Sequence, residues 1–199
     1  VTCVPNAPGV TEWAAGDEVM AVAPGAFGTH VTVATHLVAR KPSGLSHEQA
    51  AAVPIAFLTA VHALHECGRM RAGESLLVHA ASGGVGLAAL QLARLAGVRV
   101  LATAGSDEKR EFVRRRGAEH VMDSRSLAFA DELRRILPGG VDMVLNSLPG
   151  EAIARGIASL SIGGRFLEIG KRDIYADAPL GLHGICLLYT SPSPRDATL

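Results

Sequence analysis

The stretch His79-Ala80-Ala81-Ser82-Gly83-Gly84-Val85-Gly86-Leu87 stands between an apolar run at 75–78 and a run of good helix formers at 87–95. The first run is short and apolar, which predicts a buried strand. The second run predicts a helix that ends near Gly97. Small residues recur at Ala80, Gly83 and Gly86, so the backbone can approach a phosphate closely while N–H groups at the helix start point at its charge. We predict that this loop binds the pyrophosphate of a dinucleotide through Ser82, Gly83, Gly84, Val85 and Gly86.

Composition and charge argue against several classes of protein. The 199 residues are 48% hydrophobic with a formal net charge of zero, so no basic surface for nucleic acid is expected. No uninterrupted apolar run reaches the roughly 18 residues of a membrane span, and the first residues lack the features of a signal peptide. Cys3, Cys67 and Cys186 are odd in number and far apart, which suits a reducing compartment. We expect a soluble cytoplasmic protein that binds neither nucleic acid nor a membrane.

Metal binding is not predicted. His62 and His65 lie one helical turn apart, but no third ligand follows at a suitable spacing, and the cysteines lack a C-x-x-C spacing. His79, which precedes the glycines, is predicted to be a packed loop residue rather than a catalyst.

From residue 75 onward, short apolar runs alternate with helical patterns. Strands are expected at 75–79, 99–103, 119–122, 141–145 and 164–169. Helices are expected at 85–96, 106–116, 127–137 and 151–160. Such alternation with short connections is typical of a parallel sheet covered by helices on both faces. The predicted fold class is α/β, a Rossmann-type doubly wound parallel sheet.

The two ends of the chain differ from this pattern. Residues 1–42 predict strands at 18–22, 29–34 and 37–39, which are too few to close a barrel or sandwich alone. Ser46 forms a capping-box pattern with Gln49 at the start of a helix over 46–52, and Pro54 starts a second helix over 55–64. Residues 184–199 show no periodicity and contain Ser-Pro repeats, which leaves a flexible tail and a tail foreign to the fold as alternatives.

The end of the second strand of the alternating region indicates which dinucleotide is bound. In NAD-binding folds an Asp or Glu at this point hydrogen-bonds the ribose 2′-hydroxyl. Here the strand end is followed by Ser106, with Lys109 and Arg110 one helical turn later. A hydroxyl and two cations suit a 2′-phosphate, so NADPH is favoured over NADH. The alternative is that Lys109 and Arg110 are solvated charges at a helix start.

Five segments together resemble the medium-chain dehydrogenase/reductase superfamily, and within it the enoyl reductase domains of type I polyketide synthases and related fatty acid synthases. They are Gly16–Met20, Val53-Pro54 with Phe57–Ala60, the loop at 79–86, Asn146–Leu148 and Gly163–Asp173. The resemblance implies a strand-rich GroES-like substrate domain, with residues 1–42 as its C-terminal part. It also implies a Rossmann domain with its entry helices at 43–183, so the chain would be a fragment of a longer enzyme.

The reaction implied by the resemblance is NADPH-dependent reduction of the 2,3 double bond of an enoyl thioester carried on an acyl carrier protein. Lys171 would stabilise the enolate or supply the α-proton; a surface lysine is the alternative. The residues expected beside the nicotinamide are Thr59, Asn146, Ser147 and Leu148, and Gly170 is also expected to bind the cofactor. The family's acidic partner of this lysine lies beyond residue 182, and Asp173 is not assigned to that role.

The partners implied are the other domains of a multienzyme synthase and a second copy of the chain in a homodimer. Two alternatives remain open. One is a free-standing NADPH quinone or enone reductase, and the other is a nucleotide-binding fragment without catalysis.

Overall fold

Five parallel strands form the central sheet of the molecule. The computed structural model describes residues 2–4, 9–177 and 179, so the predicted tail at 184–199 lies outside the described residues. The strands are β3 (Ser75–Val78), β4 (Arg99–Ala104), β5 (His120–Asp123), β6 (Val141–Asn146) and β7 (Leu160–Glu168). They pair in the order β5-β4-β3-β6-β7, and every pairing is parallel. The predicted parallel sheet is confirmed.

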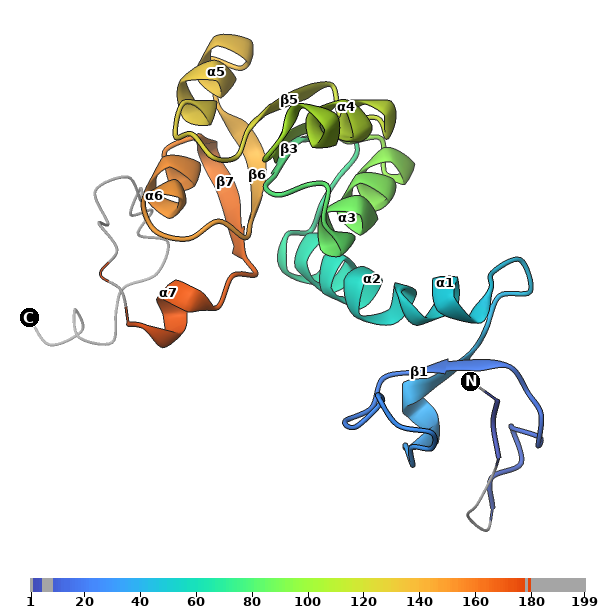
Figure 1. Cartoon of the computed structure of the whole chain (residues 1–199). Helices are drawn as coiled ribbons and strands as arrows, with labels where there is room; N and C mark the ends of the chain where they lie inside the picture. The colour runs from blue at the N-terminus through green and yellow to red at the C-terminus, as the bar shows by residue number, and fades with distance from the viewer. Residues whose placement is uncertain (1, 5–8, 178, 180–199) are drawn as a thin grey trace, which may run out of the picture.

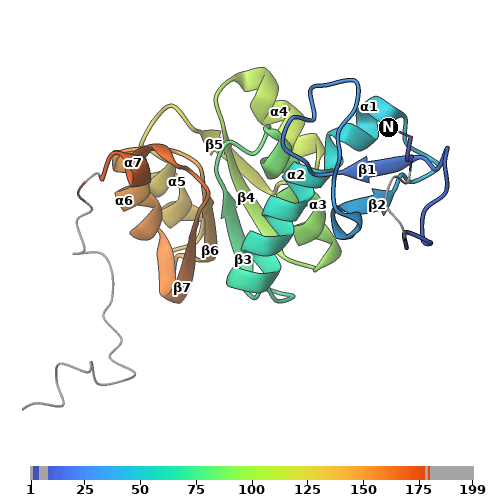
Figure 2. The same cartoon turned by 90° about the horizontal axis from the view of Figure 1, so that it is seen from below.

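Helices cover both faces of this sheet (Figures 1 and 2). On one face lie α2 (Val53–Val61), α3 (Gly84–Leu95) and α4 (Asp107–Arg115), and on the other lie α5 (Phe129–Ile136) and α6 (Glu151–Ile157). Successive side chains of β3 point to opposite faces of the sheet. Leu76 and Val78 belong to the hydrophobic core on the face of α2, α3 and α4, and Leu77 belongs to the core on the face of α5 and α6. A central strand buried on both faces has no polar alternation, which explains the apolar run at Leu76–Val78.

The strand order reverses between β3 and β6. From β3 the chain builds outward through β4 and β5, then crosses back to place β6 and β7 on the other side. In open α/β sheets, ligands bind in the crevice at such a reversal, outside the carboxyl ends of the strands. His79 follows β3 and Ser147 follows β6 at this point, and the Ser147 hydroxyl donates a hydrogen bond to the His79 carbonyl at 3.5 Å. The candidate site therefore lies at this edge.

The helical entry to the sheet forms as the sequence predicts. The Gln49 N–H donates to Ser46 Oγ at 3.2 Å and the Ser46 N–H donates to Gln49 Oε1 at 2.9 Å, which completes the capping box of α1 (His47–Ala51). Pro54 lies in the first turn of α2, where its missing N–H costs nothing. Helix α2 continues into η2 (His62–Cys67), a π-helical turn.

The continuous helical stretch His47–Cys67 has 21 residues, and an 18-residue window within it has a mean hydropathy of 1.4, enough by length and composition to cross a membrane. The sequence predicted no span, because polar residues interrupt the apolar runs. Ala60, Ala63 and Leu64 of this stretch are buried in the core that α3 and the sheet also form. Only 22% of that window is buried, and a single stretch of this kind is by itself weak evidence for a membrane span.

Two expectations about strands are wrong. Residues 29–34 form no strand: Thr29 lies in a bend, and residues 30–34 pair with no strand among the described residues. Strand β7 begins at Leu160 rather than Gly164, and α6 ends at Ile157, because Leu160 already pairs with Val141 before a register irregularity. The sequence did not predict the earlier start of β7, because Gly163 and Gly164 interrupt the strand and glycine is typical of turns.

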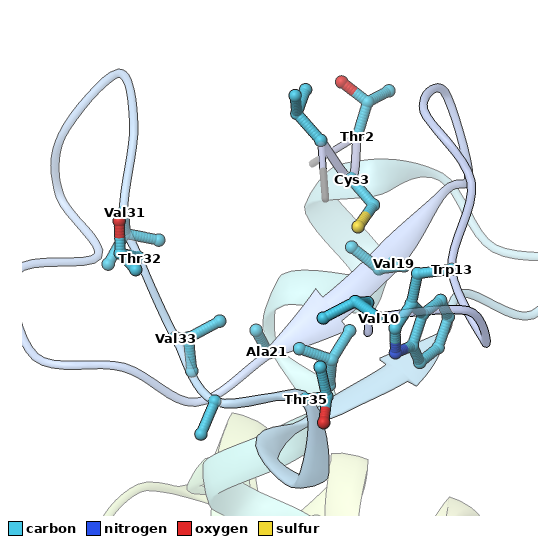
Figure 3. A pocket seen from close by; sticks show the side chains of 13 residues that line it. Thr2, Cys3, Val10, Trp13, Val19, Ala21, Val31, Thr32, Val33 and Thr35 are labelled. Carbon is cyan, nitrogen blue, oxygen red and sulfur yellow. The ribbon is translucent and has the colours of Figure 1, made fainter. Parts of the chain in front are cut away.

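A small antiparallel sheet of β1 (Val19–Ala21) and β2 (Val38–Arg40) lies apart from the five-stranded sheet (Figure 1). Beside it is an open hollow of about 390 Å³, lined mainly by valine and threonine side chains (Figure 3). Val31, Thr32, Val33 and Ala34 all line this hollow, so the alternation in the sequence does not separate a side that faces the hollow from one that does not. No residue of the hollow belongs to the carboxyl edge of the large sheet, so the candidate site does not include it.

Candidate cofactor-binding and active site

The glycine-rich loop makes a tight turn from β3 into α3. Ala80 has a positive φ of 49°, and the Gly83 N–H donates to the Ala80 carbonyl at 2.9 Å. A Cβ at Gly86 would lie 2.6 Å from the Ala81 Cα and 2.7 Å from its carbonyl atoms, so only glycine fits there. Gly83 is the N-cap of α3 and makes no side-chain cap hydrogen bond. The N–H groups of the first turn of α3 are therefore unpaired within the helix and suited to a phosphate.

His79 holds this loop to the neighbouring strands. The residue is 3% exposed, and its Nδ1 lies 3.0 Å from Thr103 Oγ1. Its ring packs edge-on against Phe129, with 4.7 Å between the two ring centroids. Burial lowers the pKa of His79 to about 4, so the imidazole is neutral at physiological pH. The prediction of a packed loop residue is confirmed.

Acidification is expected to destabilise the fold through His79. The unfolded chain takes up the proton near pH 6.5, whereas the folded chain does so only near pH 4. Stability from this group is therefore complete above about pH 6.5 and is lost as the pH falls to about 4, a change of about 3 kcal/mol. Urea unfolding across this range should show a shallower pH dependence for His79→Gln than for the unchanged chain. Equal pH dependence in the two proteins would contradict the assignment.

The turn after β6 is held by the buried side chain of Asn146. Its Nδ2 donates to the Leu148 carbonyl at 2.8 Å and to Glu168 at 2.6 Å, while its Oδ1 accepts from the Leu148 N–H at 3.2 Å. These bonds occupy the amide, so Asn146 shapes the turn and its side chain is not presented to a ligand. Ser147 and Leu148 line a cavity of about 120 Å³ together with Gly170 and Lys171.

Lys171 lies between β7 and the short helix α7 (Arg172–Tyr175). Its side chain is exposed and makes no hydrogen bond or ion pair with any described residue. Asp173 accepts hydrogen bonds from the Gly150 N–H at 3.2 Å through both oxygens and lies 3.8 Å from Arg172 Nε. Asp173 therefore ties α7 to the start of α6 and is not paired with Lys171.

Thr59 lies on α2, which packs on the glycine loop: the Ala56 Cβ is 3.7 Å from where a Cβ at Gly84 would be. Thr59 is half-buried one turn after Ala56, but it does not line the cavity that holds Ser147 and Lys171. The structure thus places Thr59 on a helix that contacts the loop, without direct contact to the lysine end.

Of the two cations expected at the 2′-phosphate, Arg110 is engaged elsewhere. It donates to the Ala104 carbonyl at 3.3 Å and forms ion pairs with Asp107 and with Asp123, the latter at 3.5 Å. Its side chain is only 17% exposed, so it braces the strand ends rather than facing a ligand. Lys109 is exposed, and its N–H donates to Ser106 Oγ at 3.3 Å, which caps α4.

Arg125, which the sequence did not single out, lies beside this strand end. Its Nε is 3.3 Å from where a Cβ at Gly105 would be, and Ser124 Oγ is 3.5 Å from the same point. Arg125 follows β5, the neighbour of β4, and its side chain is exposed. The cations presented at the end of β4 are therefore Lys109 and Arg125.

The described residues contain no group of three or more His, Cys, Asp or Glu side chains placed to hold a metal ion. His62 Nε2 lies 3.7 Å from Cys67 Sγ on the π-helical turn, and no third ligand joins this pair in the described ranges. The absence of a metal stays a prediction.

Comparison with known proteins places this geometry in a family. The sequence profile of the zinc-binding dehydrogenase family matches residues 84–190. The chain belongs to this family. One relative, a phenolphthiocerol/phthiocerol polyketide synthase polypeptide of Mycobacterium tuberculosis, is 53% identical over 168 residues, which are 84% of the chain and 8% of that synthase. The chain thus spans about a twelfth of the length of this curated relative.

Solved structures of zinc-binding dehydrogenase relatives agree with the fold. The nucleotide-binding subdomain of the enoyl reductase domain of PpsC from M. tuberculosis is 56% identical with a TM-score of 0.63, covering 66% of this chain and 74% of that one. A mycobacterial protein solved in complex with NADPH is 32% identical with a TM-score of 0.79, covering 85% of this chain and 54% of that one. The resemblance to polyketide synthase enoyl reductase domains is confirmed, and the α/β fold class with it.

Proposed function

We propose that the chain is the nucleotide-binding part of an enoyl reductase domain that uses NADPH to reduce the 2,3 double bond of an enoyl thioester on an acyl carrier protein. The observation that carries the proposal is the meeting of Ser147, Gly170 and Lys171 around one cavity outside the carboxyl ends of β6 and β7, next to the strand reversal, where Ser147 also contacts the start of the loop after β3. In this proposal, residues 1–42 end a GroES-like substrate domain and 43–183 form the nucleotide-binding domain.

Nicotinamide, when bound, supplies the hydride for the β-carbon of the enoyl group. The protein must orient the substrate and stabilise the negative charge that develops on the thioester oxygen. Lys171 has an exposed ammonium without a carboxylate partner among the described residues. Such a group is able to stabilise the enolate or donate a proton to the α-carbon. The proposed pyrophosphate contacts are the first-turn N–H groups of α3 and Ser82.

NADPH is the proposed cofactor because the end of β4 itself carries no carboxylate: Asp107 and Glu108 come only after Ser106, and exposed Lys109 and Arg125 lie at the same strand end. The NADPH complex of the mycobacterial relative supports this choice. We propose Ser106, Lys109 and Arg125 as the residues that contact the 2′-phosphate. Arg110 would hold the ends of β4 and β5 in place beside them through its bonds to Ala104 and Asp123.

Arg125→Ala is expected to weaken NADPH binding about tenfold while leaving NADH binding unchanged, because only NADPH carries the phosphate that this guanidinium meets. Calorimetric titration of both dinucleotides measures the two affinities. Arg115→Ala, on the exposed face of α4, is the matched control and should change neither. An equal loss of affinity for NADH and NADPH in Arg125→Ala would remove it from the phosphate site.

The proposed partners are the acyl carrier protein and the other domains of a cytoplasmic multienzyme synthase, as in the curated relative, which is part of a polyketide synthase. A homodimer also remains a proposal.

The test of the function uses the complete reductase domain that contains this chain. With a trans-2-enoyl pantetheine thioester, we expect NADPH absorbance to fall at a rate that saturates with thioester concentration, and the saturated thioester to be the product. Turnover of quinones or free enones with no turnover of the thioester would favour a free-standing quinone or enone reductase. Binding of NADPH without turnover of either substrate would favour a nucleotide-binding module without catalysis.

A further inference from the structure

Glu168, the last residue of β7, connects two turns at the carboxyl edge. Its Oε2 accepts a hydrogen bond from Asn146 Nδ2 at 2.6 Å, and its Oε1 accepts one from the backbone N–H of Gly170. Asn146 and Glu168 are partners in register across β6 and β7, so the parallel pairing brings the two side chains together. One carboxylate therefore holds both the turn after β6 and the backbone immediately before Lys171.

The Asn146 end of this bridge is rigid. Asn146 is fully buried, and its remaining hydrogen bonds go to the backbone of Leu148 in both directions. Its amide is thus satisfied only while Glu168 keeps its place, because a buried donor without a partner costs the full desolvation penalty. The orientation of the turn that lines the cavity with Ser147 and Leu148 depends on this contact.

The Gly170 end of the bridge is close and direct. A Cβ at Gly170 would lie 2.6 Å from Glu168 Oε1 and 3.7 Å from the Ser147 carbonyl, so both turns crowd this residue. No Lys, Arg or His in the described ranges forms an ion pair with Glu168. Both donors to the carboxylate are therefore neutral amides of the two turns, and the Lys171 ammonium is left unpaired.

We propose that Glu168 is a positioning residue of the reductase, which sets the backbone at Gly170, and so the origin of the Lys171 side chain, against the turn of Asn146–Leu148. This inference rests on the proposed function, since it assigns Glu168 a part in the reaction through Lys171. A misplacement of about 1 Å at a reacting group is able to cost about 100-fold in rate. The carboxylate is needed for its two acceptor oxygens rather than for its volume.

Glu168→Gln in the complete reductase domain tests whether the two acceptor oxygens of the side chain, rather than its volume, are needed. Glutamine keeps the size and shape of the side chain but turns an NH₂ group toward either Asn146 Nδ2 or the Gly170 N–H, where two donors then face each other. We expect kcat for enoyl thioester reduction to fall about 10- to 100-fold with little change in the affinity for NADPH. Glu168→Asp, which keeps both acceptors, should retain more activity than Glu168→Gln. Glu132→Gln, on the exposed face of α5, is the matched control and should behave as the unchanged domain.

A kinetic double-mutant cycle with Lys171→Ala tests whether Glu168 acts through the lysine. We expect Glu168→Gln to cost less than about twofold when Lys171 is already replaced, because the group that it positions is gone. Full additivity, or unchanged kcat in Glu168→Gln, would overturn the proposal.

Amide hydrogen exchange provides a readout independent of activity. Glu168→Gln should speed exchange at Gly170 and Leu148 while the rest of the sheet keeps its protection. If the unchanged domain reduces no thioester, the proposed function fails, and exchange still reports whether the bridge exists. Unchanged exchange at both residues would refute the bridge itself.

Discussion

Gly86→Ala is expected to abolish measurable dinucleotide binding and to lower the free energy of unfolding. The added methyl would lie 2.6 Å from the Cα of Ala81, a fully buried residue of the turn between β3 and α3. The contacts are backbone atoms, so no side-chain rotation relieves them, and α3 must move away from the strand. Overpacking of this kind costs about 1–3 kcal/mol in stability. Because the first turn of α3 moves with the helix, its N–H groups lose their alignment toward a pyrophosphate.

A second substitution in the same loop provides the control for folding. A Cβ at Gly84 would meet only the Ala56 Cβ at 3.7 Å, an ordinary contact, so Gly84→Ala should unfold at the same denaturant concentration as the unchanged chain. Urea unfolding and fluorescence titration of NADPH measure the two effects on each variant. Gly86→Ala with unchanged stability and unchanged NADPH affinity would show that the close approach of α3 to β3 is not needed.

The sheet was predictable from sequence because its strands are short, apolar and separated by helical patterns. Strand β3 is buried on both faces, and its run Ser75–Val78 could therefore be located without alternation. The strand expected at 29–34 is wrong, because it was predicted from alternation alone. Alternating side chains predict an extended backbone, but a strand also requires a hydrogen-bonded partner, and that depends on residues distant in sequence.

The site was predictable at the level of segments and less so at the level of side chains. The loops after β3, β4, β6 and β7 were found from glycines and strand ends. The parallel pairing places all four along one edge of the sheet, and those after β6 and β7 line a common cavity. The direction of each side chain depends on neighbours from other strands. Arg110 turns inward because Asp123 of β5 lies within reach, and Asn146 turns inward because Glu168 of β7 accepts its amide. Arg125 was missed because its position beside Gly105 requires the strand order, which the sequence does not state.

Lys171→Ala in the complete reductase domain is expected to lower kcat for enoyl thioester reduction by about 10²- to 10⁴-fold, the range typical of a positioned acid or base. NADPH affinity should change little, because the side chain makes no hydrogen bond or ion pair that holds another described residue in place. Arg172→Ala, one residue along, removes an exposed cation that lies near Asp173, and it should retain most of the turnover. Turnover in Lys171→Ala equal to that of the unchanged domain would make the residue a surface lysine.

Lys171→Arg then distinguishes the two roles open to the ammonium. Arginine keeps the positive charge beside the developing enolate but does not release its proton at ordinary pH. If Lys171 acts by charge, arginine should restore most of the turnover lost in Lys171→Ala, since electrostatic stabilisation needs no proton transfer. If Lys171 donates the α-proton, arginine should leave kcat as low as alanine does, and the deuterium label taken up from heavy water should lose its preference for one face of the α-carbon. The stereochemistry of that label therefore decides the role, because water reaches the enolate from either side once no positioned donor remains.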